Sequence, residues 1–357
     1  MDSRERFLRA CRRQAVDRPP VWFMRQAGRY MAEYRRLRER FSLLELCQRP
    51  DLATEVTVTA VERLGVDAAI IFADLLLPAE PLGLKLRYAA GEGPVITPAL
   101  RDAADPAAAI AALPAPEAEA LGYVSEAIRR TRAHFAGRIP VIGFAGAPFT
   151  LASYLVEGGA SRTFVATKRL LWEHPAAWAH LMEKLCPLLT AFLADQVAAG
   201  AAAVQLFDSW AGALSEADYR QFVLPYVRLI VAAIEGLGTP VIYFSTGTAG
   251  YLETLRETGA SVISVDWRVD LAAARERLGE GVAVQGNLDP AALLAPPAEL
   301  RRAVQRVLAA AGDPPGYIFN LGHGILPETP VENVRAVVAM VQDAPAARPR
   351  RESAEGM

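Results

Sequence analysis

Along the chain, short apolar runs alternate with longer segments in which apolar residues recur at helical spacing. Eight of the runs have the length and composition of buried strands, and predicted helices separate most of them. The predicted strands begin near Val21 and Ala68 and continue at 140–144, 202–207, 240–244, 261–265, 282–285 and 317–321. The alternation predicts an α/β fold, a single-domain (β/α)8 barrel of the TIM type.

A doubly wound open sheet is the alternative way to alternate strands and helices. Its first turn usually carries the glycine pattern G-x-G-x-x-G, which does not follow the first predicted strand here. The pattern therefore favours the barrel. We expect residues 1–342 to form this barrel with an N-terminal helical extension, and residues 343–357 to be a disordered polar tail.

Four local features are also expected. Amphipathic spacing near the start predicts a short helix that ends before Pro19. A helix is expected over 51–64 with Asp51 as its N-cap, and a hairpin within 84–97 around a glycine-rich turn. The alanine- and proline-rich stretch 105–116 reads as a surface linker.

Composition limits the possible partners. The 357 residues are 52% hydrophobic, and 38 basic and 40 acidic side chains leave a net charge of −2. Such a balance gives no general attraction to nucleic acid or to an anionic membrane. No apolar run reaches the roughly 18 residues of a membrane span, and the N-terminus lacks an apolar signal core. The three scattered cysteines form no metal-binding spacing, so we expect a cytoplasmic protein without a metal site.

The segment 20–30 carries the first candidate chemistry, because an apolar strand ends there in two cations. Arg25 and Arg29 follow the strand at the end where barrels place their active sites. Guanidinium groups bind carboxylates or phosphates through paired hydrogen bonds, so the segment indicates a polyanionic ligand. An alternative for Arg29 is an ion pair with Glu33, one helical turn further on.

Other strands are followed by polar residues that could share the same pocket: Asp74, Ser209 and His323, with Tyr154 shortly after the fourth run. Each has a structural alternative. Asp74 and Ser209 could cap helices, Tyr154 could be a buried tyrosine, and a lone histidine is often structural. No nucleophile elbow, zinc-protease motif, phosphate-binding loop or strand-end lysine is found.

Two long segments, 20–30 and 143–154, closely resemble the signature segments of the uroporphyrinogen decarboxylase family. Residues 71–74 and 320–324 match that family's other active-site segments, in the same order. The resemblance extends from about Arg4 to Val341. It implies a (β/α)8 barrel that acts as a homodimer without metal or organic cofactor. The implied reaction removes carbon dioxide from the four acetate side chains of uroporphyrinogen III, giving coproporphyrinogen III in porphyrin and haem synthesis.

The resemblance also implies roles for individual residues. Asp74, Arg25 and Tyr154 would be catalytic, and the substrate would be bound by Arg25, Gln26, Ala27, Gly28, Arg29, Asp74, Tyr154, Ser209 and His323. An ionised aspartate fits this chemistry, because it accepts hydrogen bonds from four converging pyrrole N–H groups and stabilises a protonated, cationic ring. An arginine holds its proton too tightly to be a good acid, so the general acid remains open.

Three other functions remain as alternatives. Corrinoid-linked methyltransferases of the same superfamily hold zinc through a His-x-Cys type motif, whereas Gly324 and Ile325 follow His323 here. A non-catalytic tetrapyrrole carrier would need the same binding residues. A barrel enzyme acting on phosphates is a further option, since Asn287 and residues 322–324 follow strands at a position where barrels often bind phosphate.

Overall fold

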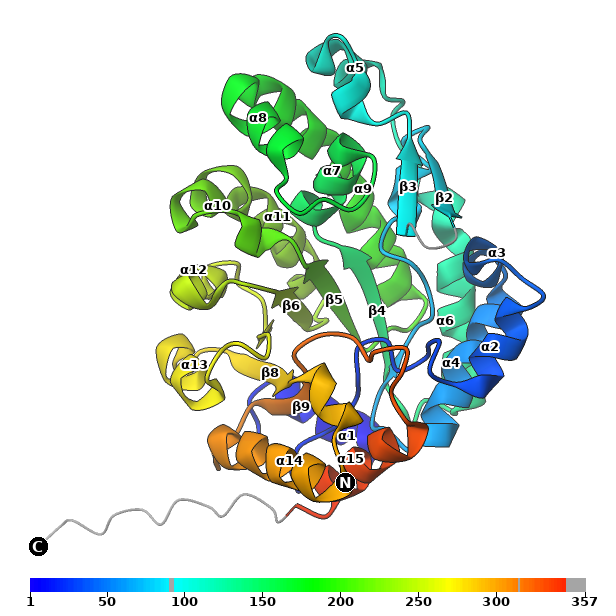
Figure 1. Cartoon of the computed structure of the whole chain (residues 1–357), viewed down its shortest axis with the longest axis vertical. Helices are drawn as coiled ribbons and strands as arrows, with labels where there is room; N and C mark the ends of the chain where they lie inside the picture. The colour runs from blue at the N-terminus through cyan, green and yellow to red at the C-terminus, as the bar shows by residue number, and fades with distance from the viewer. Residues whose placement is uncertain (90–92, 314, 345–357) are drawn as a thin grey trace, which may run out of the picture.

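The computed structural model describes residues 1–89, 93–313 and 315–344. Seven parallel strands form one curved sheet in the order β1-β4-β5-β6-β7-β8-β9, and helices surround it (Figure 1). The barrel strands are β1 (Ala69–Ile70), β4 (Val141–Gly146), β5 (Ala203–Asp208), β6 (Val241–Ser245), β7 (Val262–Ser264), β8 (Ala283–Leu288) and β9 (Tyr317–Leu321). The alternation of strands and helices confirms the predicted barrel fold.

The helices follow the predicted segments for most of the chain. The α-helices are α1 (Ser3–Cys11), α2 (Ala32–Arg38), α3 (Leu43–Gln48), α4 (Pro50–Leu64), α5 (Pro106–Ala112), α6 (Gly122–His134), α7 (Pro148–Glu157), α8 (Val165–Glu173), α9 (Pro175–Ala198), α10 (Glu216–Phe222), α11 (Leu224–Glu235), α12 (Leu252–Arg256), α13 (Leu271–Leu278), α14 (Pro297–Ala311) and α15 (Val331–Gln342). Short 3-10 helices are η1 (Leu77–Ala79), η2 (Leu100–Asp102), η3 (Ala118–Leu121), η4 (Ala211–Ala213), η5 (Ala249–Tyr251) and η6 (Pro290–Leu294).

The predicted strand at Val21 is reduced to a single parallel bridge with Phe319 of β9. On its other side, the Val21 carbonyl accepts the N–H of Asp67 at 2.8 Å, just before β1. Pro19 and Pro20 have no N–H to donate, so the ladder cannot extend toward the N-terminus. The N–H of Val21 itself bonds to the Asp67 carboxylate at 3.0 Å. This segment therefore closes the barrel between β9 and β1 with few backbone hydrogen bonds.

Asp67 also anchors the N-terminal extension to the barrel. Its carboxylate is buried and lies 3.1 Å from Arg6 of α1 and 2.6 Å from Arg18. The hydroxyl of Ser3 donates to it at 2.8 Å. A buried carboxylate is tolerated when cations and hydrogen-bond donors surround it in this way. The extension is thus held at the end of the barrel opposite the predicted site.

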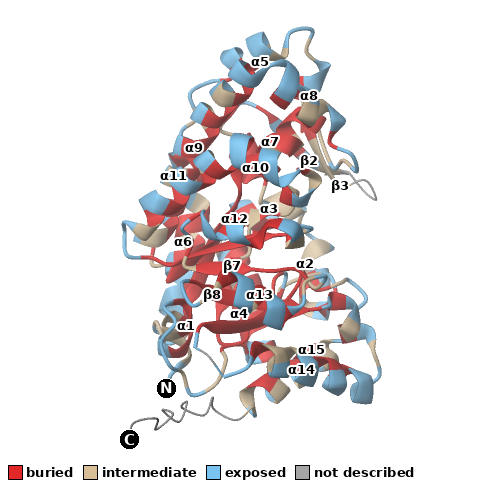
Figure 2. Cartoon of the chain, turned by 90° about the vertical axis from the view of Figure 1, so that its left-hand side faces the viewer, coloured by how far each residue is buried: buried red, intermediate tan, exposed pale blue. Residues whose placement is uncertain are grey.

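Buried residues are concentrated on the strands and on the helix faces that turn toward them (Figure 2). The barrel interior contains a polar layer as well as apolar side chains. The Trp22 indole donates to Gln285 at 3.0 Å, and the Gln285 amide donates to Gln205 at 3.1 Å and to Ser264 at 2.9 Å. The interior is therefore a packed and hydrogen-bonded core rather than a pore, and chemistry is left to its open end.

Three local expectations are tested by the structure, and a fourth lies mostly outside the described residues. The hairpin is confirmed as β2 (Lys85–Ala89) paired with β3 (Gly93–Thr97), and its predicted turn lies outside the described residues. The linker prediction for 105–116 is wrong, because Asp105 caps the first turn of α5 by accepting from two backbone N–H groups. Asp51 is not an N-cap, since α4 already begins at Pro50. The predicted tail is described only to Ala344, and 345–357 lie outside the described residues.

Besides α5, the helices α3, α7 and α15 were not predicted. In the described residues no helix is long and apolar enough to cross a membrane.

Candidate active site

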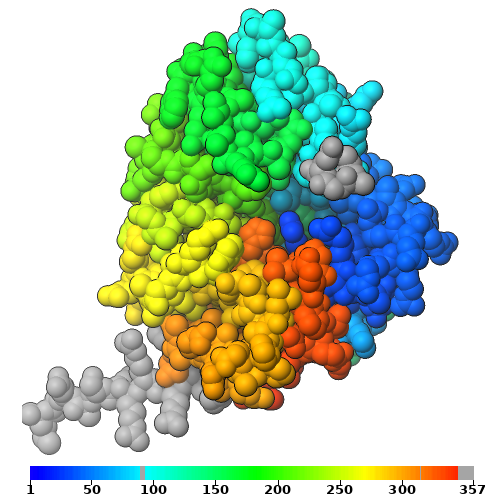
Figure 3. Space-filling view, viewed as in Figure 1, coloured from blue at the N-terminus to red at the C-terminus, as the bar shows by residue number. Residues whose placement is uncertain are grey.

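The predicted site residues follow the carboxyl ends of the barrel strands. Figure 3 shows one face of the molecule hollowed where the N-terminal part of the chain, its middle third and the segment after β9 meet. Asp74 follows β1, Tyr154 lies on α7 after β4, Ser209 follows β5 and His323 follows β9. Parallel strands in a barrel end on one side, so the fold gathers residues that are far apart in sequence.

Arg25 occupies a turn that leaves the first barrel segment. The preceding residues Val21 to Met24 are buried, whereas Arg25 is exposed and has a left-handed backbone with φ 59°. The stem of its side chain lies on Gly324, where an added Cβ would stand 2.7 Å from the Arg25 Cγ. The N–H of Ile325 donates to the Met24 carbonyl at 3.0 Å, which ties this turn to the loop after β9. The backbone of Gly324 and Ile325 thus fixes the position of Arg25.

Asp74 is partly exposed and stands at the end of β1. One carboxylate oxygen accepts the N–H of Leu76 at 2.9 Å, which starts the turn into η1. The hydroxyl of Tyr88 on β2 is a second hydrogen-bond partner of this carboxylate. Burial raises the pKa of Asp74, while the two hydrogen bonds and the positive charge of Arg25 act to lower it. Asp74 therefore caps a turn and still presents a partly desolvated acid to the hollow.

Tyr154 lies beside this acid on the first helix after β4. Burial and the negative charge of Asp74 raise the pKa of the phenol, and a hydrogen bond from the Trp210 indole and the charge of Arg25 oppose this. Its ring packs against the ring of Trp210 at a centroid distance of 5.9 Å. A phenol with a raised pKa stays protonated, so Tyr154 remains a hydrogen-bond donor. Ser209, the neighbour of Trp210, is partly exposed on the same wall.

His323 follows β9 at the same end of the barrel. Its Nδ1 accepts the N–H of Gly324 at 2.8 Å, so the proton of the neutral ring is on Nε2. Burial and, to a lesser degree, the charges of Arg25 and Arg268 lower the pKa of His323 to about 4, against the opposing charge of Asp266. The ring also packs edge-on against Phe244 at 6.0 Å. His323 is therefore a neutral donor at ordinary pH.

Within residues 25–29, some side chains are exposed and others are buried. Arg29 is exposed, and Glu33, the alternative partner considered for it, lies instead 3.8 Å from Arg63. Gly28 is partly exposed in the turn between the two arginines. Arg25 and Arg29 thus both keep their guanidinium groups at the surface.

The side chains of Gln26 and Ala27 are placed differently from those of the two arginines. The Gln26 side chain is fully buried, accepts the N–H of Phe23 at 3.2 Å and donates to the Ala68 carbonyl at 3.1 Å. Its amide is therefore turned to the backbone of the barrel and is not exposed. Ala27 lines a small gap against Met31 and Tyr34, behind the turn. The structure places these two side chains in support of the turn.

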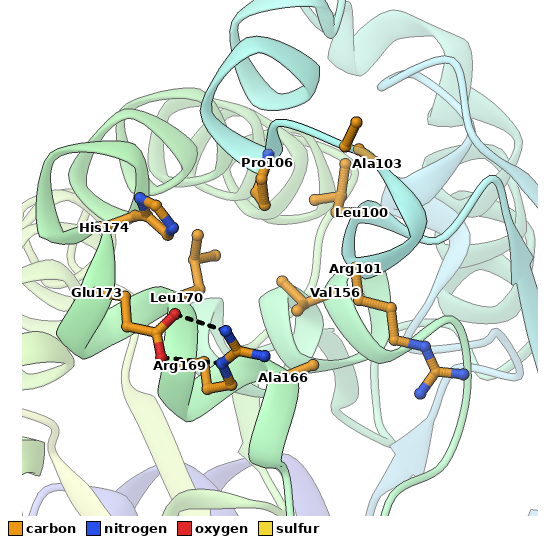
Figure 4. Close-up of a pocket in the computed structure, with 11 residues that line it drawn as sticks. Leu100, Arg101, Ala103, Pro106, Val156, Ala166, Arg169, Leu170, Glu173 and His174 are labelled. Atoms are coloured by element: carbon orange, nitrogen blue, oxygen red, sulfur yellow. Dashed lines mark hydrogen bonds and ion pairs between the residues drawn. The ribbon is translucent and has the colours of Figure 1, made fainter.

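A separate cavity lies away from these strand ends. It has a volume of about 280 Å³ and separates the segment after η2 from α8, as Figure 4 shows. Leu100 and Leu170 face into it, and Arg169 and Glu173 form an ion pair at 2.9 Å along one side. This cavity contains none of the strand-end residues, so it is not part of the site described here.

Sequence reasoning missed two residues that contact the site. Tyr88 comes from a hairpin that is not part of the barrel repeat. Its only sequence signal is the alternation of side chains along a strand, which places it on one face of the hairpin. Trp210 directly follows Ser209 and could have been included with it. Among the described residues, no group of three or more His, Cys, Asp or Glu side chains is arranged to hold a metal ion.

Comparison with known proteins gives consistent results. A family model described as uroporphyrinogen decarboxylase (URO-D) matches residues 2–344. Proteins named uroporphyrinogen decarboxylase are 54% identical in Solibacter usitatus, over 95% of this chain and 97% of the relative, and 55% identical in Sorangium cellulosum, over 96% and 97%. Another from Koribacter versatilis is 53% identical over 94% of this chain and 95% of its own length.

A solved structure of a methyltransferase from Methanosarcina mazei has a similar fold. Its TM-score is 0.81, and the match covers 96% of this chain and 99% of the methyltransferase. Sequence identity is 20%, so this similarity concerns the fold alone.

Proposed function

We propose a reaction mechanism from one premise: the chain belongs to the uroporphyrinogen decarboxylase family and is a carboxy-lyase. Its substrate is uroporphyrinogen III, whose four acetate side chains become methyl groups in coproporphyrinogen III. The observation that carries the mechanism is the Asp74 carboxylate after β1, partly exposed and close enough to Arg25 and Tyr154 for charge to affect the pKa of both the acid and the phenol. One anion among cationic and hydroxyl donors suits a substrate with N–H groups at its centre and carboxylates at its rim.

Asp74 has the central role in this mechanism. Its Oδ1 accepts the N–H of Leu76 and Tyr88 is a further partner, and the remaining lone pairs of the carboxylate can accept from the pyrrole N–H groups. When a pyrrole carbon is protonated, the ring becomes a cationic electron sink. The bond between the acetate methylene and its carboxylate then breaks, carbon dioxide leaves, and the electron pair moves into the ring. A proton is next added to the methylene carbon and the ring proton is lost, so each cycle consumes one proton in total. The negative charge of Asp74 stabilises the cation throughout.

The other residues bind and orient the substrate. Arg25 and Arg29 would bind rim carboxylates, because both are exposed beside the hollow. Tyr154 and the Nε2–H of His323 are neutral donors that would bind carboxylates without changing the charge of the site. Ser209 would add a hydroxyl on the wall next to Tyr154. No arginine is assigned as the general acid, since its proton is held too tightly.

We also propose that the chain forms a homodimer in the cytoplasm and needs neither metal nor organic cofactor. The family resemblance supports the dimer, and the three buried free cysteines suit a reducing compartment. Size-exclusion chromatography with light scattering would measure the mass directly, and a monomer at micromolar concentration would contradict the dimer. Activity that dialysis against a chelator removes and zinc restores would contradict the cofactor-free mechanism and favour methyl transfer.

The decisive experiment is anaerobic incubation with uroporphyrinogen III followed by mass analysis of the product. Four successive losses of one carbon dioxide each are expected. A substrate that binds but keeps its mass would identify a tetrapyrrole carrier instead, and this result would refute the proposed reaction.

A further inference from the structure

A second carboxylate lies behind the wall of the site, and the mechanism above does not use it. Asp208, the last residue of β5, is fully buried. Its oxygens accept from hydroxyl groups rather than from a cation: Thr150 donates at 2.7 Å and Tyr243 at 2.6 Å. The Tyr243 oxygen in turn accepts from Tyr219 at 2.9 Å. Burying a carboxylate costs free energy even with such donors, so a non-polar residue would serve packing alone at least as well.

The hydroxyls of Thr150 and Tyr243 each have a single proton, and each donates it to Asp208. The Thr150 oxygen also accepts the backbone N–H of Trp210 at 3.2 Å. The carboxylate therefore determines which way the Thr150 hydroxyl points, and that hydroxyl holds the backbone of Trp210. On the other side, Tyr243 leads away from the site to the equally buried Tyr219.

Trp210 transmits this arrangement to the site. Its ring packs on Tyr154 at 5.9 Å and on Phe164 at 5.2 Å. The Trp210 indole also acts to lower the pKa of the Tyr154 phenol, so the two groups interact as well as pack. An indole nitrogen can only donate, so a hydrogen bond between them leaves the Tyr154 proton free to point to Asp74 or to a substrate carboxylate.

We propose that Asp208 and Thr150 are positioning residues for the decarboxylation, acting through Trp210 on the hydroxyl of Tyr154. The inference rests on the proposed function, because Tyr154 is given a catalytic role there. Asp208 itself does not contact the substrate. Its contribution is to orient the Thr150 hydroxyl, which fixes Trp210 and thereby the direction of the Tyr154 proton.

The test compares isosteric variants of one buried threonine. Thr150→Val keeps the volume but removes the hydroxyl, and Thr150→Ser keeps the hydroxyl. The matched control is Thr131→Val on α6, whose buried hydroxyl has no hydrogen-bond partner in the described residues. Tyr243→Phe removes the donor to Asp208 on the side away from Trp210.

Thr150→Val is expected to lower kcat by on the order of tenfold to a hundredfold, the cost of a misplaced catalytic group, with KM changed by less than about threefold. Thr150→Ser is expected to restore most of this loss, and Thr131→Val to leave kcat within about twofold of the parent. Tyr243→Phe should lower kcat less than Thr150→Val does. A folded Thr150→Val enzyme with normal kcat would overturn the proposal, and so would a control as damaging as Thr150→Val.

A second readout does not depend on turnover. The chain has five tryptophans, so a ¹⁵N-tryptophan spectrum should contain five indole signals, and Trp210→Phe assigns the relevant one. Thr150→Val and Asp208→Asn should shift this signal, whereas Thr131→Val should not. An unmoved Trp210 signal in both variants would refute the coupling even if activity were lost. If the parent protein released no carbon dioxide, the proposed function would fail, and this spectrum would still decide the structural part of the inference.

Discussion

Replacing Asp74 by asparagine separates charge from shape at the centre of the proposed site. The side-chain oxygen of asparagine can accept the Leu76 N–H in place of the aspartate Oδ1, which accepts it at 2.9 Å. The side-chain volume is nearly unchanged. The variant should therefore fold, with a free energy of unfolding within about 1 kcal/mol of the parent. What it loses is the negative charge, and what it gains is an NH₂ group that would face the pyrrole N–H donors.

The expected loss of activity follows from the electrostatics of a partly buried site. A carboxylate about 4 Å from a cationic ring is worth about 4 kcal/mol at an effective dielectric constant of about 20. Since about 1.4 kcal/mol corresponds to a factor of ten in rate, kcat should fall roughly 10³-fold. Removal of one preorganised donor or charge elsewhere typically costs about 10²–10³. We therefore expect kcat to be lower by at least about 10².

The assay is anaerobic product formation, with thermal melting measured on the same preparations. Asp289→Asn is a matched control, because Asp289 also follows a barrel strand and accepts the N–H two residues later, from Ala291 at 2.9 Å. It is exposed and has no assigned role in the reaction. If Asp74→Asn melted much earlier than the control while its folded fraction remained fully active, Asp74 would be structural and the mechanism would be wrong.

Three further changes test the rest of the site. Arg29→Ala should raise KM about tenfold or more with little change in Tm, because one charged hydrogen bond of about 1.5–3 kcal/mol is lost, and an unchanged KM would count against the binding role. Tyr88→Phe removes a hydrogen bond that lowers the pKa of the catalytic aspartate, so the acid limb of the kcat profile should move to higher pH, whereas Tyr123→Phe should leave the limb in place. Gly324→Ala puts a methyl group against the stem of the first arginine and should weaken substrate binding, while Gly250→Ala, which has open space around it, should not.

The barrel and most of its helices could be predicted, because buried parallel strands and amphipathic helices leave strong periodic patterns. Helix α5 was missed since its stretch of alanines and prolines resembles a linker, and the cap that starts it, Asp105, is a single residue. The strand-end residues Asp74 and His323 were found because the barrel rule points to them directly. The barrel rule could not identify Tyr88, because this residue lies on a hairpin outside the repeat of strands and helices.

The orientation of Gln26 shows a different limit of sequence reasoning. A polar residue between two arginines is typical of a binding segment, and the two arginines are indeed exposed. Its side chain instead replaces backbone partners that a regular strand would have supplied. Such a role depends on which ladder bonds are missing, and that is visible only when the strands are in place.

The missing ladder explains how the first segment can end in a functional turn. Three backbone N–H groups of this segment are satisfied by side chains: Val21 by Asp67 at 3.0 Å, Phe23 by Gln26 at 3.2 Å and Met24 by Asn320 at 3.2 Å. Buried N–H groups must find acceptors, and these three side chains allow the strand to stop early without leaving any of them unpaired.

Because the strand stops early, Arg25 can adopt the left-handed backbone that a continuing strand would forbid. That conformation costs a non-glycine residue about 1–2 kcal/mol, and the surrounding hydrogen bonds have to offset this cost. In return the guanidinium leaves the core and reaches over Gly324 toward His323. The buried amide of Gln26 therefore stabilises the turn, and the turn places the charge of Arg25 at the surface.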